Sequence, residues 1–247
     1  MTVAAFDEIA ARYDDLWTRS TVGCLQREAV WRRIGRLFSA GQSVLDLGCG
    51  TGEDALRLMR AGVRVRAIDA SPEMVRIARR RGVDAETVRA EECGLLCDRF
   101  DGIISNFGAL NCVEDLGSLR DPLAGLISPG GHLAVCILGR FCAWELVWNL
   151  LRRDQAKALR RFGKSAPSSL GVRVFYPSAE DLISALRPAF ALLDWRGVGL
   201  CVPPSYVTPL PDRLLEKLDA WDRRIAHWPL LRGCADHRLF VFARSAS

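Results

Sequence analysis

One short segment, Ser43–Gly52, constrains the fold of this chain more than any other. Its first half is apolar and predicts a buried strand, and it ends with a glycine at every second position, namely Gly48, Gly50 and Gly52. A helical pattern begins at Glu53. A strand that leads through a glycine-rich turn into a helix places free backbone N–H groups beside a ligand. Glycine is needed there because the backbone turns sharply and the ligand comes close.

The glycine spacing separates this loop from a dinucleotide-binding loop, which reads G-x-G-x-x-G. Here the third glycine comes one residue early, and Glu53 stands where the dinucleotide loop has its last glycine. An acidic residue, Asp46, also precedes the first glycine by two positions. Taken alone, the glycines could also form a tight turn that holds no ligand.

The bulk composition is that of a globular protein. With 247 residues, 49% of them hydrophobic and 26% charged, the chain fits a single domain over 1–247. It shows no leader-like start and no apolar run of roughly 18 residues, so we expect a cytoplasmic protein without a transmembrane segment. Its nine cysteines are scattered without a C-x-x-C pair, so we expect reduced thiols and no metal site.

Strand-like and helix-like segments alternate after residue 40, which predicts a parallel, doubly wound α/β sheet. The expected strands cover residues 43–49, 63–69, 85–90, 100–107 and 132–138, and the expected helices cover 53–60, 72–81 and 114–127. The second of these strands ends in Asp69, 19 residues after Gly50. A carboxylate at that strand end can accept both hydroxyl protons of a ribose. Because Ser71-Pro72 supplies the better cap for the next helix, Asp69 is free for that role.

These motifs together resemble those of class I S-adenosylmethionine-dependent methyltransferases of the small-molecule type. Further matches are the N-terminal phrase FDEIAARYDDLW, the strand end Asn106–Asn111, and the Pro-Gly-Gly turn within Ile127–Gly131. The resemblance implies a Rossmann-like, doubly wound seven-stranded sheet, mostly parallel with the last strand antiparallel. Helical cap insertions are expected at about 1–40, 139–170 and 203–235.

The resemblance also implies a cofactor, S-adenosylmethionine, with S-adenosylhomocysteine as its product. The positions that match the family's cofactor motifs are Tyr13, Asp46, Gly48, Cys49, Gly50, Gly52, Asp69, Ala70, Met74, Ala90, Glu91, Asn106 and Phe107. In this reading Tyr13 closes over the cofactor, although Tyr13 and Trp17 could equally be aromatic residues of the core. Arg89 stands where the family often has an acidic residue, so the adenine contact would fall to Ala90 and Glu91.

The insertion at 139–170 has a distinctive composition. Trp144, Val147, Trp148 and Leu151 fall at helical spacing and are expected to pack on one face, and basic residues from Arg153 to Lys164 are expected to share a helical face. Four readings stay open: a lid over a hydrophobic acceptor, a membrane-surface helix, a site for an anionic acceptor, and a solvated basic face on a packed helix.

The predicted function is methyl transfer by in-line displacement to a small-molecule acceptor with aromatic or lipid-like surface. The protein must hold the acceptor in line and exclude water, and a base helps only if the acceptor arrives protonated. Candidates for such a role are Tyr13, Asn106, Asn111 and Tyr206. Two alternatives are a nucleic-acid-modifying methyltransferase that uses the basic face 152–164 and a non-catalytic cofactor-binding protein. A nucleic-acid partner is not expected, because no RNA-binding module or base-methylation motif is present.

Overall fold

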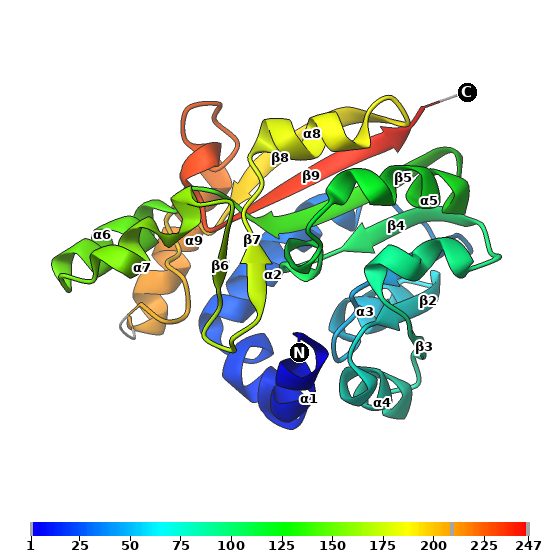
Figure 1. Ribbon diagram of the computed structural model, residues 1–247, viewed down its shortest axis with the longest axis horizontal. Helices are drawn as coiled ribbons and strands as arrows, with labels where there is room; N and C mark the ends of the chain where they lie inside the picture. Colours follow the sequence, from blue (N-terminus) through cyan, green and yellow to red (C-terminus); the bar gives the residue numbers. More distant parts are fainter. Residues whose placement is uncertain (1, 208–209, 246–247) are drawn as a thin grey trace.

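The computed structural model describes residues 2–207 and 210–245, and a seven-stranded sheet forms its centre (Figure 1). The strand order is β3-β2-β1-β4-β5-β9-β8, and β9 runs antiparallel to both of its neighbours. The strands are β1 Ser43–Leu47, β2 Arg64–Asp69, β3 Asp84–Thr87, β4 Phe100–Ser105, β5 Ile127–Leu138, β8 Phe190–Val198 and β9 His237–Arg244. The predicted Rossmann-like sheet with one antiparallel strand is therefore confirmed.

Helices cover both faces of this sheet, as the two-residue period of its strands requires. Along β5, Leu133, Val135 and Ile137 belong to one core cluster, while Ala134 and Cys136 belong to another. The first cluster includes residues of α5 (Arg120–Leu126) and α8 (Ala179–Leu186), and the second includes residues of α2 (Thr21–Ile34) and α3 (Glu53–Arg60). The remaining helices are α1 Thr2–Tyr13, α4 Pro72–Arg80, α6 Ala143–Leu151, α7 Gln155–Leu159 and α9 Asp212–Ile225.

The turn from β1 into α3 has the backbone that its glycines allow. Gly48, Gly50 and Gly52 all have positive φ angles, of +79°, +54° and +83°. A Cβ on Gly48 would lie 2.2 Å from the Cβ of Ala109, whereas a Cβ on Gly50 would meet no protein atom within 4 Å. Gly48 is therefore required by packing, and Gly50 leaves space open at the end of the sheet. At the next turn Ser71 caps α4 with Pro72 at the first position, as predicted.

Several predicted boundaries were wrong. Strand β3 ends at Thr87, so Ala90 and Glu91 begin a 3-10 helix, η2 (Ala90–Leu95). The helix expected over 114–127 is a 3-10 turn, η4 (Leu116–Leu119), followed by the short α5, because Pro122 is tolerated only in a first turn. Within the insertion expected to be helical at 139–170, a short strand forms instead, β6 (Ser165–Pro167), which pairs with β7 (Arg173–Phe175).

The insertion after β5 forms a lobe that projects from the body of the molecule, made of α6 and α7 (Figure 1). The predicted packing of its apolar face was wrong, because Val147 and Leu151 are 54% and 76% exposed. The predicted shared basic face was also wrong. The helix breaks at Arg153, which has a φ of +60°, and Arg161 is buried instead of facing solvent.

Candidate cofactor-binding site

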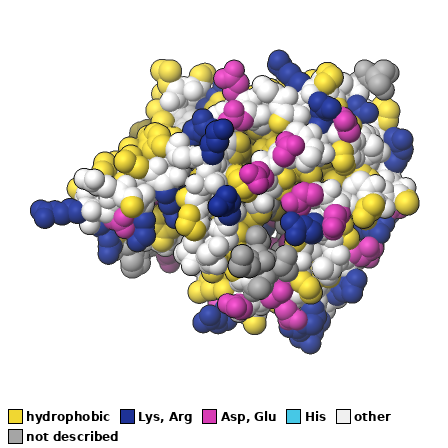
Figure 2. Space-filling model, viewed as in Figure 1, with side chains coloured by type: hydrophobic (Ala, Val, Ile, Leu, Met, Phe, Trp, Pro, Cys, Tyr) yellow, Lys and Arg dark blue, Asp and Glu magenta, His cyan; other side chains and the backbone are white. Residues whose placement is uncertain are grey.

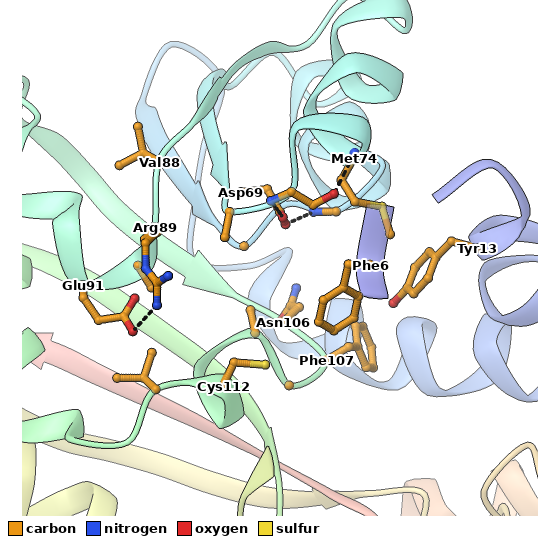
Figure 3. A pocket seen from close by; sticks show the side chains of 18 residues that line it. Phe6, Tyr13, Asp69, Met74, Val88, Arg89, Glu91, Asn106, Phe107 and Cys112 are labelled. Carbon is orange, nitrogen blue, oxygen red and sulfur yellow. Dashed lines mark hydrogen bonds and ion pairs between the residues drawn. The ribbon is translucent and has the colours of Figure 1, made fainter. Parts of the chain in front are cut away.

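A cavity of about 170 Å³ lies beyond the carboxyl ends of β1, β2 and β4, where the strand order reverses (Figure 3). Ligands of open α/β sheets bind at this switch point. The cavity brings together ten of the thirteen predicted cofactor residues: Tyr13, Gly48, Gly50, Asp69, Ala70, Met74, Ala90, Glu91, Asn106 and Phe107. These come from segments almost 100 residues apart, so only the fold assembles them.

Asp69 is held at this cavity by the backbone around it. The N–H of Gly50 donates to Asp69 Oδ2 at 2.8 Å, and the N–H of Ser71 donates to Asp69 Oδ1 at 2.9 Å. Burial raises the pKa of Asp69, and the two backbone N–H groups partly offset that rise. Each carboxylate oxygen accepts one protein hydrogen bond here and retains a lone pair that can accept another.

One side of the cavity combines apolar side chains with an ion pair. Met74 and Val88 lie near the ends of β2 and β3, and Arg89 donates to Glu91 Oε1 at 3.4 Å beside them (Figure 3). Six further lining residues were not predicted: Phe6, Ser71, Val88, Arg89, Cys112 and Val113. Gly108 and Ala109 also line the cavity and belong to the strand end Asn106–Asn111 that the sequence singled out. Phe6 could have been found, because it lies seven residues before Tyr13 and so on the same helix face.

Three predicted cofactor positions, Asp46, Cys49 and Gly52, do not line the cavity. Asp46 is 1% exposed, and its pKa is raised well above the usual range by burial and then by the nearby Asp54. A Cβ on Gly52 would meet Ala78 and Val83 at 3.1 Å, so this glycine lets the loop pack against α4. These three residues therefore lie outside the cavity, and the buried Asp46 and Gly52 support the glycine loop through packing.

Helix α1 and the turn that follows it cover the cavity, and each is tied to the surrounding structure by an aspartate. Asp7 accepts from the hydroxyl of Ser71 at 2.5 Å and from the N–H of Glu73 at 3.2 Å. Asp14, at the start of the π-helical turn η1 (Asp14–Thr18), accepts from the hydroxyl of Thr51 at 2.8 Å. Tyr13 consequently lines the cavity from the end of α1, next to Phe6 (Figure 3).

The pKa of Tyr13 is raised to about 12, first by burial, while Arg27 opposes the rise. The phenol is therefore neutral at physiological pH. Its hydroxyl can donate a hydrogen bond there, but it cannot act as a base.

Asn106 and Phe107 form the wall at the end of β4. The side chain of Asn106 donates to Asp54 Oδ2 at 3.2 Å, while its own carbonyl oxygen is buried and has no hydrogen-bond partner. Phe107 has a φ of +52° and packs between Trp17 and His237, with ring centroids 4.6 Å and 5.6 Å away. A buried acceptor without a partner beside a cavity fits a ligand that carries a donor.

The other two catalytic candidates, Asn111 and Tyr206, do not line this cavity. Asn111 is clamped between backbones: it donates to the carbonyls of Leu138 and Phe175 at 3.1 and 2.6 Å and accepts from the N–H of Leu138 at 2.8 Å. The hydroxyl of Tyr206 donates to Glu145. Both side chains are engaged in structural contacts, so they are not available to an acceptor at this cavity.

No cluster of three or more His, Cys, Asp or Glu side chains suited to a metal ion occurs within residues 2–207 and 210–245. All nine cysteines are free thiols. In the described part of the chain, no helix is both long enough and apolar enough to cross a membrane.

The fold and the cavity define a nucleoside-binding α/β domain, with a glycine loop after β1 and a carboxylate at the tip of β2. The residues fit S-adenosylmethionine: Gly50 leaves open space beside the loop, Asp69 retains acceptor capacity, and Asn106 carries an unpartnered buried oxygen.

Comparison with known proteins shows which nucleoside-binding proteins this chain resembles. Residues 44–131 match the family model of a methyltransferase domain. The chain is 37% identical to a demethylmenaquinone methyltransferase of Clavibacter sepedonicus over 140 residues, which is 54% of this chain and 56% of that protein. It is 35% identical to a ubiquinone biosynthesis O-methyltransferase of Xanthomonas oryzae pv. oryzae over 111 residues, or 42% and 46% of the two chains. The chain thus spans about half the length of the curated relatives it matches.

Among solved structures, the fold is similar to that of a 1,6-didemethyltoxoflavin-N1-methyltransferase of Burkholderia thailandensis, with a TM-score of 0.58. The identity is 18%, and the alignment covers 99% of this chain and 88% of the other. The family match over residues 44–131 and the relatives support the resemblance to class I S-adenosylmethionine-dependent methyltransferases, and the solved structure shows the same fold. The resemblance predicted from the sequence is confirmed.

Proposed function

We propose that this protein transfers a methyl group from S-adenosylmethionine to a small-molecule acceptor with an aromatic, quinone-type ring. The observation that carries the proposal is Asp69, which two backbone N–H groups hold at the cavity with a lone pair left on each oxygen. This arrangement suits the two hydroxyls of a ribose. The glycine loop beside it suits the amino-acid half of the cofactor, and the wall of Met74 and Val88 suits the adenine.

When bound, the cofactor supplies an activated methyl group on a sulfonium, so the chain needs to supply little covalent chemistry. Its residues hold the two reactants and exclude water. Tyr13 and Phe6 on α1 cover the cavity, and Phe107 closes the side that faces His237. The cavity is therefore enclosed largely by aromatic and apolar groups.

Two ionisable groups of the cavity, Tyr13 and Cys112, offer no base to the acceptor, which favours an acceptor that is acidic in its own right. At neutral pH the phenol of Tyr13 and the thiol of Cys112, whose pKa burial raises to about 11, are both protonated. Neither can take a proton from a weakly acidic hydroxyl. A phenol, a hydroquinone or an acidic ring carbon loses its proton more readily, so it depends less on a base supplied by the protein. The names of the two relatives, which refer to demethylmenaquinone and to ubiquinone biosynthesis, support the same class of acceptor.

The alternative of a nucleic-acid substrate depended on a single basic face over residues 152–164, and the fold does not form that face. Arg160 and Arg161, two of the basic residues expected to form one face, both bind the carboxylate of Glu145. We therefore do not propose a nucleic-acid substrate.

Two measurements test the proposal. Isothermal titration with S-adenosylhomocysteine should give micromolar binding that Asp69→Ala weakens. Transfer of tritiated methyl from S-adenosylmethionine to a short-chain demethylated quinol should then give turnover. Absence of cofactor binding would refute the proposal as a whole. Cofactor binding without turnover on any phenolic or quinol acceptor would instead favour the non-catalytic cofactor-binding protein.

A further inference from the structure

The lobe formed by α6 and α7 carries an apolar surface that nothing within residues 2–207 and 210–245 covers. Five large apolar side chains at its surface are each 48–76% exposed: Val147, Leu150, Leu151, Leu159 and Phe162. Val147, Leu150 and Leu151 fall at positions i, i+3 and i+4 of α6, so they share one face of that helix. Exposed apolar residues that gather on one projecting element mark an interaction surface.

The same lobe holds a large excess of positive charge. Segment 139–170 contains seven Arg and Lys against two acidic residues, a net charge of +5, which equals that of the whole chain. Arg152, Arg153, Lys157 and Lys164 are exposed, whereas the acidic Asp154 is already paired with Lys157 at 3.0 Å. Figure 2 shows the lobe as an extension of the molecule with hydrophobic atoms along it and Lys or Arg atoms at its tip and lower edge.

We propose that this lobe docks on an anionic phospholipid surface. An exposed apolar face flanked by Arg and Lys suits the boundary between headgroups and acyl chains: the apolar side chains enter it, and the cations reach the phosphates. Arg and Lys near such a surface are attracted to its anionic lipid headgroups. A second copy of this chain is a poorer occupant, because its matching lobe carries the same net positive charge of +5.

The lobe is joined to the cavity by buried contacts, so docking would also orient the cavity. Glu145 on α6 is 1% exposed and accepts from Arg160 at 2.6 and 2.8 Å and from Arg161 at 2.8 and 3.0 Å. Arg161 also donates to Asp236 Oδ1 at 2.6 Å, beside the first residue of β9. From the β6–β7 hairpin, the carbonyl of Phe175 accepts from Asn111, which is next to the cavity residue Cys112.

The test is sedimentation of the full chain with vesicles of equal parts phosphatidylglycerol and phosphatidylcholine, and with vesicles of phosphatidylcholine alone. We expect binding to the anionic vesicles that weakens as salt is raised, with at least about tenfold less binding to neutral vesicles. Val147→Glu/Leu151→Glu should reduce binding by at least about tenfold, and Arg152→Glu/Arg153→Glu should do the same.

Matched controls separate the lobe from general charge and hydrophobicity. Leu193→Glu removes an apolar residue that is 52% exposed on β8, and Arg36→Glu/Arg64→Glu makes the same charge change on exposed arginines elsewhere. Neither control should reduce vesicle binding to the extent that the lobe variants do. All variants should keep the circular dichroism spectrum and the cooperative thermal unfolding of the wild type, which shows that they are folded.

Failure of the wild-type chain to bind anionic vesicles, or equal losses in the lobe and control variants, would overturn the proposal. A wild-type dimer in solution that becomes monomeric in Val147→Glu/Leu151→Glu, without vesicle binding, would assign the face to self-association instead. The inference goes beyond the proposed function and does not depend on it, since vesicle binding needs neither cofactor nor acceptor.

Discussion

Asp69 and Gly50 are joined by a 2.8 Å hydrogen bond that ties the tip of β2 to the glycine loop after β1. Through this contact the loop backbone and the carboxylate form one unit at the switch point of the sheet. The bond leaves the second side of Asp69 Oδ2 open to the cavity, and the N–H of Ser71 fixes the other carboxylate oxygen in the same way. The carboxylate is thereby held in place before any ligand arrives, which reduces the entropy lost on binding.

The first prediction concerns the charge of Asp69. Asp69→Asn should weaken S-adenosylhomocysteine binding by about 10- to 100-fold, because an amide offers a single acceptor oxygen and turns its NH₂ group toward a backbone N–H. Isothermal titration measures the change. Asp121→Asn, which alters an exposed aspartate paired with Arg120, should bind the ligand like the wild type. Equal affinity in wild type and Asp69→Asn would show that this carboxylate does not contact the cofactor.

The second prediction tests whether Gly50 is needed for ligand binding in addition to its left-handed backbone conformation. Gly50 and Gly82 have φ angles of +54° and +87°, and a Cβ on either would meet no protein atom within 4 Å. Alanine at each should therefore cost a similar amount of stability, about 1–2 kcal/mol. Only Gly50→Ala should lose affinity for S-adenosylhomocysteine, because its methyl group would occupy the open space at the loop. Thermal unfolding and titration of both variants check this, and parallel losses of affinity would contradict it.

The third prediction concerns the buried carboxylate of Glu145. Burial alone would raise the pKa of Glu145, but Arg160 and Arg161 outweigh burial and lower it. Glu145→Gln should cost about 3 kcal/mol of unfolding free energy at neutral pH, because it leaves buried guanidinium charge without its carboxylate. Glu180→Gln, at an exposed position of α8, should change little.

The pH dependence of that loss follows from the lowered pKa. A carboxyl whose folded pKa is depressed stabilises the fold above its unfolded pKa, and that stabilisation is lost as the pH falls through the folded value. The difference in unfolding free energy between wild type and Glu145→Gln should thus be full at pH 7 and shrink below about pH 4. Denaturant titrations across this range measure it, and a difference that grows on acidification would refute the assignment.

The fourth prediction concerns the hydroxyl of Tyr13, whose pKa is about 12. Because the phenol stays neutral, S-adenosylhomocysteine affinity should not follow a titration of Tyr13 between pH 7 and pH 10. Tyr13→Phe, which keeps the ring, should bind within a few-fold of wild type, whereas Tyr13→Ala should lose about tenfold because it uncovers the cavity. A pH-dependent affinity in this range that Tyr13→Phe abolishes would instead assign an ionising role to the hydroxyl.

Much of the cofactor site could be predicted because its residues follow strand ends in the sequence. Gly48, Asp69 and Asn106 each lie at the end of a predicted strand, and parallel strands bring those ends to one edge. The residues that were missed lack such a signal: Cys112 and Val113 line the cavity because the short turn η3 (Ala109–Cys112) folds back under it. Asn111, expected near the acceptor, serves as a clamp between two backbones, a role that sequence spacing does not reveal.

The sequence by itself determined the α/β order, the glycine loop and the position of Asp69, because these depend on local periodicity and on conformations that few residues adopt. Only the tertiary structure decided what the basic insertion does. A run of Arg and Lys at helical spacing looks like one surface, but the chain breaks at Arg153, and the buried Glu145 draws Arg160 and Arg161 inward. Burying a carboxylate requires nearby opposite charge, and which cations supply it depends on contacts between distant segments.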